Sequence, residues 1–341
     1  MTYSRFSFLL IGGALLFDSL TACAQPRAEY VADKPVSGFI RIWGHGSLNE
    51  NYLASLMSAW ELGLHQFQPN IRFQTTLRGN STAIGGLYTG AADVALIERR
   101  PISIELDAYQ AIFKQDPFEI VVATGSLDVQ NHNPALVVFV HSNNPLKSLT
   151  LAQLDAIISA DHRRSTKPIH TWGELGLTGA WKNKTIKVYI PAISSMESQF
   201  LEQTVMGGSQ KWTANLREFN AVPRHSDPGR KILDALAKDQ YAIAVSTMVN
   251  KNVQVKPLSL AINENSPNIY PSRESVAQRS YPLTRSISIF INHTQGQTIT
   301  QPLKEYLRYI LSAQGQADIE RDGMYFPLNP EILAQERSKL N

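Results

Sequence analysis

The sequence of 341 residues has a single cysteine, Cys23, and one cysteine excludes an internal disulfide. Its net charge is only +3 and no run of five or more basic residues occurs, which argues against nucleic acid as a partner. The eight histidines form no HExxH motif and no carboxylate-flanked pair at metal spacing. We therefore expect neither a metal nor a cofactor.

Motifs of the common enzyme classes are also missing. No G-x-S-x-G elbow or Walker loop occurs, and Gly44-His45-Gly46 lacks the third glycine of a dinucleotide-binding loop. The sequence predicts no catalytic residues and a protein that is not an enzyme. A surface hydrolase remains an alternative only if a nucleophile lies hydrogen-bonded to a base.

The composition is that of a folded protein, with 43% hydrophobic and 18% charged residues. A chain of this length favours two domains. Hydrophobic periodicity predicts strands at 38–43, 71–77 and 92–97, with helices over 53–64 and 83–89 between them. This β-α-β-α-β order predicts a parallel sheet.

A second block continues the alternation of strands and helices. We expect strands at 119–124, 135–141, 185–191, 241–247 and 283–292, helices at 151–160, 195–205, 227–236 and 300–312, and a closing loop at 315–328. The fold class is therefore α/β, with two doubly wound lobes. Ligands in such folds bind outside the carboxyl ends of strands, where helix N-termini favour anions.

The N-terminus predicts export. Residues 1–22 read as a signal peptide, because the apolar run Phe6–Phe17 is too short to span a bilayer. Leu20-Thr21-Ala22-Cys23 resembles a bacterial lipobox, in which the cysteine is lipidated; the alternative is an incidental thiol. Residues 23–37 suit a flexible tether. We expect a protein of the periplasm or cell surface, anchored to a bacterial membrane by lipid at Cys23.

Three stretches, in order along the chain, resemble one family. They are RGNSTAIGGLYTGAADVALIERRPISIE (78–105), the segment 149–191 with LTLAQLDAII, HTWGELGLTGAW and KVYIP, and the segment YPLTR (281–285) with the tail GQADIERDGMYFPL. They are similar to the periplasmic phosphate-binding proteins of ABC importers. The resemblance implies a type II periplasmic-binding-protein-like fold, a monomer, a phosphate or similar small oxyanion as ligand, and an ABC permease as partner.

The resemblance also implies lobe boundaries. The first lobe would comprise residues 38–139 and 285–341, and the second residues 140–284. A hinge of two strands would join them. The turn-forming stretches 141–145 and 281–283 would lead out and back, and the ligand would lie between the lobes.

The resemblance also implies ligand-binding residues in the first lobe, position by position. Gly46 and Ser47 match the first phosphate loop loosely, and Asn80 and Ser81 fall on the family's paired serines, flanked by Gly79 and Thr82. Short donors in a flexible loop suit an oxyanion. The alternative is that Asn80, Ser81 and Thr82 cap the helix that follows.

Glu98 and Arg99 lie where the family has an acceptor of the phosphate proton and an arginine. A carboxylate at this position accepts hydrogen bonds and favours a ligand that carries its own proton. The alternative is a solvated charged turn formed by Glu98, Arg99 and Arg100.

The second lobe departs from the family pattern. Pro191 replaces the usual arginine, and Ser195-Met196-Glu197 replaces Ser-Gly-Thr, while Ser194 and Ser195 remain as donors. Loss of a guanidinium should weaken phosphate binding, and the candidates to compensate for it are Lys187, Arg224 and His225. These departures favour an alternative function, in which the same fold acts as a lipid-anchored sensor or scaffold for another ligand or a protein partner.

Overall fold

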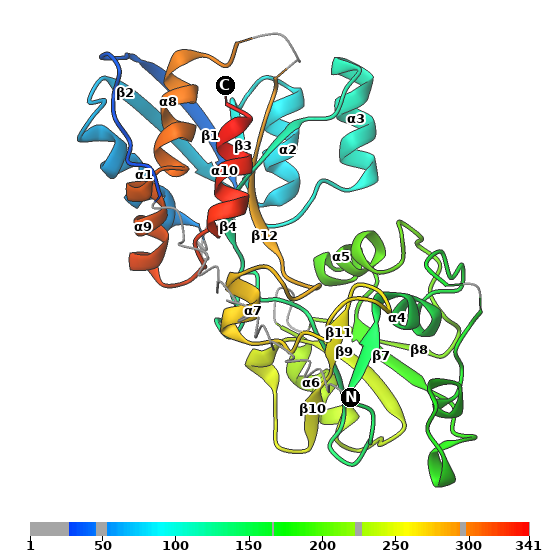
Figure 1. The fold of residues 1–341 in the computed structure, drawn as a ribbon. Coiled ribbons are helices and arrows are strands. Elements are labelled where there is room, and N and C mark those ends of the chain that lie inside the picture. Colours follow the sequence, from blue (N-terminus) through cyan, green and yellow to red (C-terminus); the bar gives the residue numbers. More distant parts are fainter. Residues whose placement is uncertain (1–26, 46–52, 166, 222–226, 294–297, 341) are drawn as a thin grey trace, which may run out of the picture.

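The structure is a computed structural model that describes residues 27–45, 53–165, 167–221, 227–293 and 298–340. Two five-stranded sheets form the centres of two lobes (Figure 1). This arrangement confirms the predicted α/β fold class. The predicted signal peptide, Cys23, Gly46 and Ser47 lie outside the described residues.

The first lobe is built on a sheet with the strand order β2-β1-β3-β12-β4. Its elements are β1 (Gly38–Gly44), α1 (Ala54–His65), β2 (Ile71–Leu77), α2 (Asn80–Tyr88), β3 (Val94–Ile97), α3 (Ser103–Phe113), β4 (Phe118–Thr124), β12 (Ser286–Ile291), α8 (Gln301–Ile310), α9 (Ala313–Asp322) and α10 (Pro330–Ser338). Strand β1 is parallel to β2 and β3, as predicted, whereas β12 runs antiparallel between β3 and β4.

The second lobe is built on a sheet with the order β10-β5-β9-β7-β8, beside a two-stranded sheet of β11 and β6. Its elements are β5 (Val137–His141), β6 (Ser148–Thr150), α4 (Leu151–Ile158), β7 (Lys187–Pro191), α5 (Met196–Thr204), β8 (Leu216–Phe219), α6 (Gly229–Leu236), β9 (Ala242–Ser246), β10 (Val255–Pro257), β11 (Ser259–Ala261) and α7 (Arg273–Ala277). Short 3-10 helices cover Trp172–Leu175, Gly179–Trp181 and Met248–Asn250.

Strand β3 shows why helices cover both faces of the first sheet. All four residues of VALI are buried. Val94 and Leu96 pack in the core under α1 and α8, whereas Ala95 and Ile97 pack with residues of α2 and α3 on the other face. Successive strand residues point to opposite faces, so a wholly apolar strand needs a cover on each side, as Figure 1 shows.

Two expectations for local structure were wrong. The predicted closing loop at 315–328 is largely helix, because α9 runs from Ala313 to Asp322. The predicted tether is in part packed, since Tyr30 is 4% exposed and its hydroxyl donates to Glu305 Oε2 on α8 at 2.5 Å. Burial of an aromatic ring with a hydrogen-bonded hydroxyl holds this segment against the first lobe.

Two chain connections lie side by side where the lobes meet. The outward connection spans residues 125–136, and the returning one ends at Arg285. Gly125 N donates to Arg285 O at 2.9 Å, and Leu136 N donates to Leu283 O at 3.2 Å. The lobes are therefore joined by two connections whose backbones are hydrogen-bonded to each other.

The boundary and hinge expected near residues 139–145 were misplaced. Strand β5 pairs with β9 and β10, so it belongs to the second sheet. The stretch 141–145 follows β5, and its Ser142 N donates to Gln254 O inside that lobe at 2.8 Å. The outward crossing comes earlier, at 125–136.

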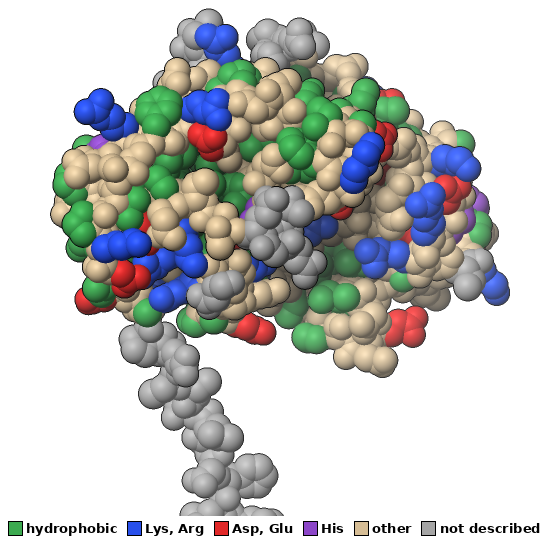
Figure 2. Space-filling view, turned by 90° about the horizontal axis from the view of Figure 1, so that it is seen from above, with side chains coloured by type: hydrophobic (Ala, Val, Ile, Leu, Met, Phe, Trp, Pro, Cys, Tyr) green, Lys and Arg blue, Asp and Glu red, His purple; other side chains and the backbone are tan. Residues whose placement is uncertain are grey.

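The surface seen from above carries charges of both signs. Lys and Arg side chains lie among Asp, Glu and apolar ones on the described part of this face (Figure 2). Among the described residues, no helix combines the length and apolar character that a membrane span requires.

We predict that Gly125→Ala loosens the lobe junction. A Cβ at this position would lie 2.3 Å from Asn133 O, so the free energy of unfolding should fall by about 1–3 kcal/mol. Urea denaturation followed by circular dichroism measures the change. Gly85→Ala in α2 is the control, since its Cβ meets nothing closer than 3.6 Å and the helix should gain about 0.5–1 kcal/mol. Equal effects of the two substitutions would contradict the tight crossing.

Candidate functional site

A cavity of about 870 Å³ opens between the lobes. Its lining comes from both lobes and from the crossing segments, and it includes His45, Arg78, Gly79, Asn80, Ser81, Thr82, Glu98, Arg99, Ser194, Ser195, Met196, Glu197, Asp227, Gly229 and Arg285. Every described residue of the predicted ligand set is among them. The cavity lies at the carboxyl ends of β1, β3, β7 and β9, where α2, α5 and α6 begin.

The start of α2 presents backbone amides to this cavity. Gly79 precedes the helix with a φ of 118° and supplies no side-chain cap. Such a φ favours glycine. The first N–H groups of a helix have no intrahelical acceptor, and they carry the positive end of its dipole. Thr82 Oγ1 donates back to Gly79 O at 2.8 Å, so the amides of this turn remain available to a ligand.

Glu98 is buried rather than part of a solvated turn, with 3% exposure. Its Oε1 accepts from Tyr325 OH at 2.8 Å, and its Oε2 contacts His45 Nδ1. Its backbone N donates to Asn80 Oδ1 at 3.2 Å. These bonds fix the carboxylate at the end of β3, within the cavity lining.

Arg99 is paired inside its own lobe. Its Nη1 and Nη2 donate to the two oxygens of Glu105 at 2.7 and 2.5 Å, and Nη2 also donates to Ser81 Oγ at 3.1 Å. Both charged side chains are less than 10% exposed, at 7% and 8%. A bidentate carboxylate neutralises this guanidinium and orients it.

The start of α5 brings the second lobe to the cavity. Ser195 caps this helix by accepting from Ser198 N at 3.2 Å, so its hydroxyl has a structural role. Met196 Sδ accepts from Asn80 Nδ2 at 3.0 Å. Asn80 and Met196 belong to opposite lobes, so the N-termini of α2 and α5 face each other across the cavity.

The start of α6 is the third helix terminus in the lining. Asp227 Oδ1 accepts from Gly229 N at 2.7 Å, and its Oδ2 accepts from Asn250 Nδ2 at 2.5 Å. A carboxylate is therefore already bound at this positive helix end. The free anion-binding capacity is concentrated at α2 and α5.

The cavity contains an arginine that sequence reasoning missed. Arg285 precedes β12 at the lobe junction, is 4% exposed and lies 3.7 Å from Glu197 across its Nη1–Oε1 contact. The feature of the sequence that could have identified Arg285 was its position at the beginning of the strand that returns to the first lobe. His45 and Tyr325 were also missed; His45 directly follows β1 at the sheet edge.

Of the three residues proposed as substitutes for the missing family arginine, the structure describes Lys187. Lys187 is 59% exposed and pairs with Asp239 at 2.8 Å, outside the cavity lining. Arg224 and His225 lie outside the described residues. The described residues contain no group of three or more metal-binding side chains.

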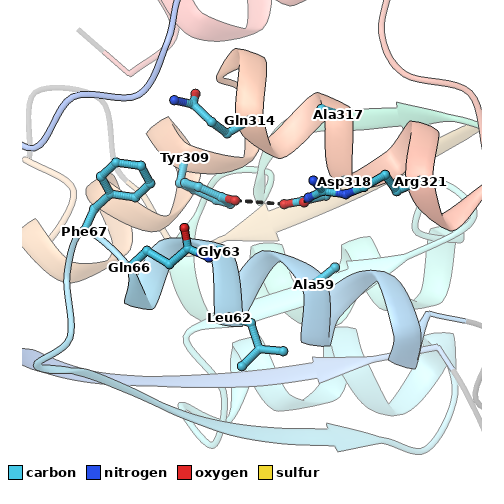
Figure 3. Close-up of a pocket in the computed structure, with 10 residues that line it drawn as sticks. All are labelled: Ala59, Leu62, Gly63, Gln66, Phe67, Tyr309, Gln314, Ala317, Asp318 and Arg321. Atoms are coloured by element: carbon cyan, nitrogen blue, oxygen red, sulfur yellow. Dashed lines mark hydrogen bonds and ion pairs between the residues drawn. The ribbon is translucent and has the colours of Figure 1, made fainter.

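A second cavity, of about 400 Å³, lies within the first lobe (Figure 3). It is bounded by α1, α8 and α9, and its polar centre is Asp318, which accepts from Tyr309 OH at 2.9 Å and pairs with Arg321. The Asp318 carboxylate therefore already has two partners. The described residues that line this cavity all belong to the first lobe. The cavity between the lobes is the better candidate site.

The comparisons agree with this geometry. The sequence profile of the PBP superfamily domain matches residues 32–314. The chain belongs to the PBP superfamily. It is 28% identical over 313 residues to the phosphate-binding protein PstS of Pseudomonas aeruginosa, covering 91% of this chain and 89% of that protein. The protein SphX of Synechococcus elongatus is 21% identical over 211 residues, covering 61% of this chain and 58% of that protein.

Solved structures of phosphate-binding and phosphate-transport proteins share the fold. PstS from Borrelia burgdorferi superposes with a TM-score of 0.55 at 15% identity, covering 86% of this chain and 99% of that one. An ABC-type phosphate transport receptor from Vibrio cholerae superposes with a TM-score of 0.51 at 19% identity, covering 84% and 99%. The predicted resemblance to a divergent phosphate-binding family is confirmed, and this superfamily member is a binding protein rather than an enzyme.

We predict that Glu105→Gln destabilises the protein, because it leaves the buried Arg99 charge without its partner. The free energy of unfolding should fall by roughly 3 kcal/mol, as measured by urea denaturation. Asp128→Asn is the control: it breaks a surface pair with Arg273 in which the side chains are 44% and 58% exposed, and such pairs contribute about 1 kcal/mol or less. A loss at Glu105 no larger than the loss at Asp128 would contradict the buried pair.

Proposed function

We propose that the protein captures phosphate or a similar small oxyanion between its lobes and delivers it to an ABC permease. The observation that carries this proposal is that the N-termini of α2 and α5 face one cavity from opposite lobes. Unpaired amides and helix dipoles stabilise an anion at such a place. A ligand bound to both helices would hold the lobes together.

Side chains add support at the same place. Ser81 and Thr82 are exposed hydroxyls on the first turn of α2, and Ser194 is an exposed hydroxyl just before α5. Glu98 is held so that its carboxylate can accept a hydrogen bond from a protonated group of the ligand. Gly79, Asn80, Ser81, Thr82, Glu98, Arg99, Ser194 and Ser195 are our ligand set, with Gly46 and Ser47 retained from the sequence.

The permease partner and the cellular location are part of the proposal. The relative from Vibrio cholerae is described as an ABC-type phosphate transport receptor, which supports transport as the role. We propose a monomeric lipoprotein of the periplasm or cell surface, anchored at Cys23, because the lipobox-like Leu20–Cys23 follows an apolar segment.

A second candidate function is that of a lipid-anchored sensor or scaffold. Met196 occupies the gap between the two helix N-termini and binds Asn80, and Glu197 adds a negative charge to the lining. Both features lower the expected affinity for a free phosphate. They favour a different ligand or a protein partner if phosphate fails to bind.

We predict that Ser81→Asp lowers phosphate affinity at least about tenfold, because a fixed carboxylate at the start of α2 repels the bound anion. Isothermal titration calorimetry on protein freed of ligand by unfolding and refolding measures the affinity. Gln301→Asp is the control, since it adds the same charge at the start of α8, outside the cavity lining. Absence of phosphate and sulfate binding to the unmodified protein would overturn the oxyanion proposal.

We predict that Cys23→Ser releases the protein from membranes, because acyl chains can no longer be attached. Cell fractionation and immunoblotting, in a bacterium that processes lipoproteins, would show the variant in the soluble fraction. Retention of the variant in the membrane fraction would contradict lipid anchoring.

A further inference from the structure

Arg285 is a buried cation with unused donors. Its side chain is 4% exposed, and a guanidinium carries five N–H donors. Within the described part of the chain, its guanidinium makes one ion-pair approach, 3.7 Å from Glu197 Oε1, and one cation–π approach, 5.9 Å from the centre of the Phe200 ring. A buried charge without hydrogen bonds is costly, so this group is prepared for an acceptor that the cavity can admit.

Glu197 stands where such an acceptor would be. It lies in the first turn of α5, it lines the same cavity, and its side chain is 30% exposed. A carboxylate presents two oxygens and one negative charge, as an oxyanion ligand does. The contact of 3.7 Å is longer than a hydrogen bond, so the carboxylate lies near the guanidinium without a hydrogen bond to it.

We propose that Arg285 receives the anionic group of the ligand, and that Glu197 occupies this position until the ligand displaces it. The proposal rests on the proposed function and adds the regulation of its affinity. Glu197 acts as an internal competitor: a ligand anion at Arg285 would meet its negative charge unless the side chain turns outward. Its partial exposure gives it room to turn.

The position of Arg285 makes the competition specific to this site. The guanidinium belongs to the crossing segment, whose backbone is fixed by the bond from Gly125 N, whereas Glu197 belongs to the second lobe. A ligand at Arg285 also lies beside the start of α5, because Glu197 is in its first turn. Displacement of Glu197 therefore frees the cation beside the start of α5.

Isothermal titration calorimetry with phosphate tests the proposal on the full chain freed of bound ligand. Glu197→Gln keeps the shape and removes the charge, and phosphate should bind roughly three- to tenfold more tightly. Glu264→Gln is the matched control, because Glu264 is exposed and does not line the cavity; its affinity should equal that of the unmodified protein. Arg285→Lys keeps a cation and should weaken binding at least about tenfold by removing the planar donors.

The outcomes separate this proposal from the proposed function. Tighter phosphate binding by Glu197→Gln than by the unmodified protein, with no gain in Glu264→Gln, supports the competitor role. Phosphate binding by the unmodified protein with no gain in Glu197→Gln would overturn the competitor role and leave the function intact. Absence of binding in every variant would overturn both. Thermal unfolding of each variant shows whether Arg285→Lys still folds, and Glu197→Gln carries the test if it does not.

Discussion

The hydrogen bond from Gly125 N to Arg285 O, 2.9 Å long, is the constraint on which the site depends. It joins the outward and returning connections at the point where the lobes meet. The backbone of Asn133 lies so close to this point that residue 125 has no room for a side chain, because a Cβ there would clash with Asn133 O. Because the crossing is this tight, Arg285 is held at the cavity, and the starts of α2 and α5 are brought to face each other.

The charges around the cavity are largely matched in pairs. Arg99 is bound by Glu105, Arg285 lies near Glu197, and Glu98 contacts His45. The first pair is buried and bidentate, whereas the second is long and partly exposed. An incoming anion would therefore displace Glu197 from Arg285 more readily than it would displace Glu105 from Arg99. Further attraction comes from the backbone amides at the starts of α2 and α5 and from Arg78, which also lines the cavity.

Local structure was more predictable from the sequence than the pairing of strands. Alternating or continuous apolar residues located β1, β2 and β3, and the helical spacing of Leu53, Leu56 and Trp60 located α1, since burial imposes these periods. The same periods do not say which sheet a strand joins, so the lobe boundary was placed inside β5, which pairs wholly within the second sheet. Helix α9 was missed because its polar residues Gln316 and Asp318 are buried by hydrogen bonds rather than by an apolar face. Arg285 was missed because its burial depends on the crossing of two distant segments.

A crystal structure of the protein grown with phosphate tests the central claim most directly. We expect an anion between the lobes, within hydrogen-bonding distance of the first-turn amides of α2 and of the Arg285 guanidinium, with the Glu197 carboxylate turned away from Arg285. A phosphate bound elsewhere, or a cavity with Glu197 still beside Arg285 at saturating phosphate, would contradict it.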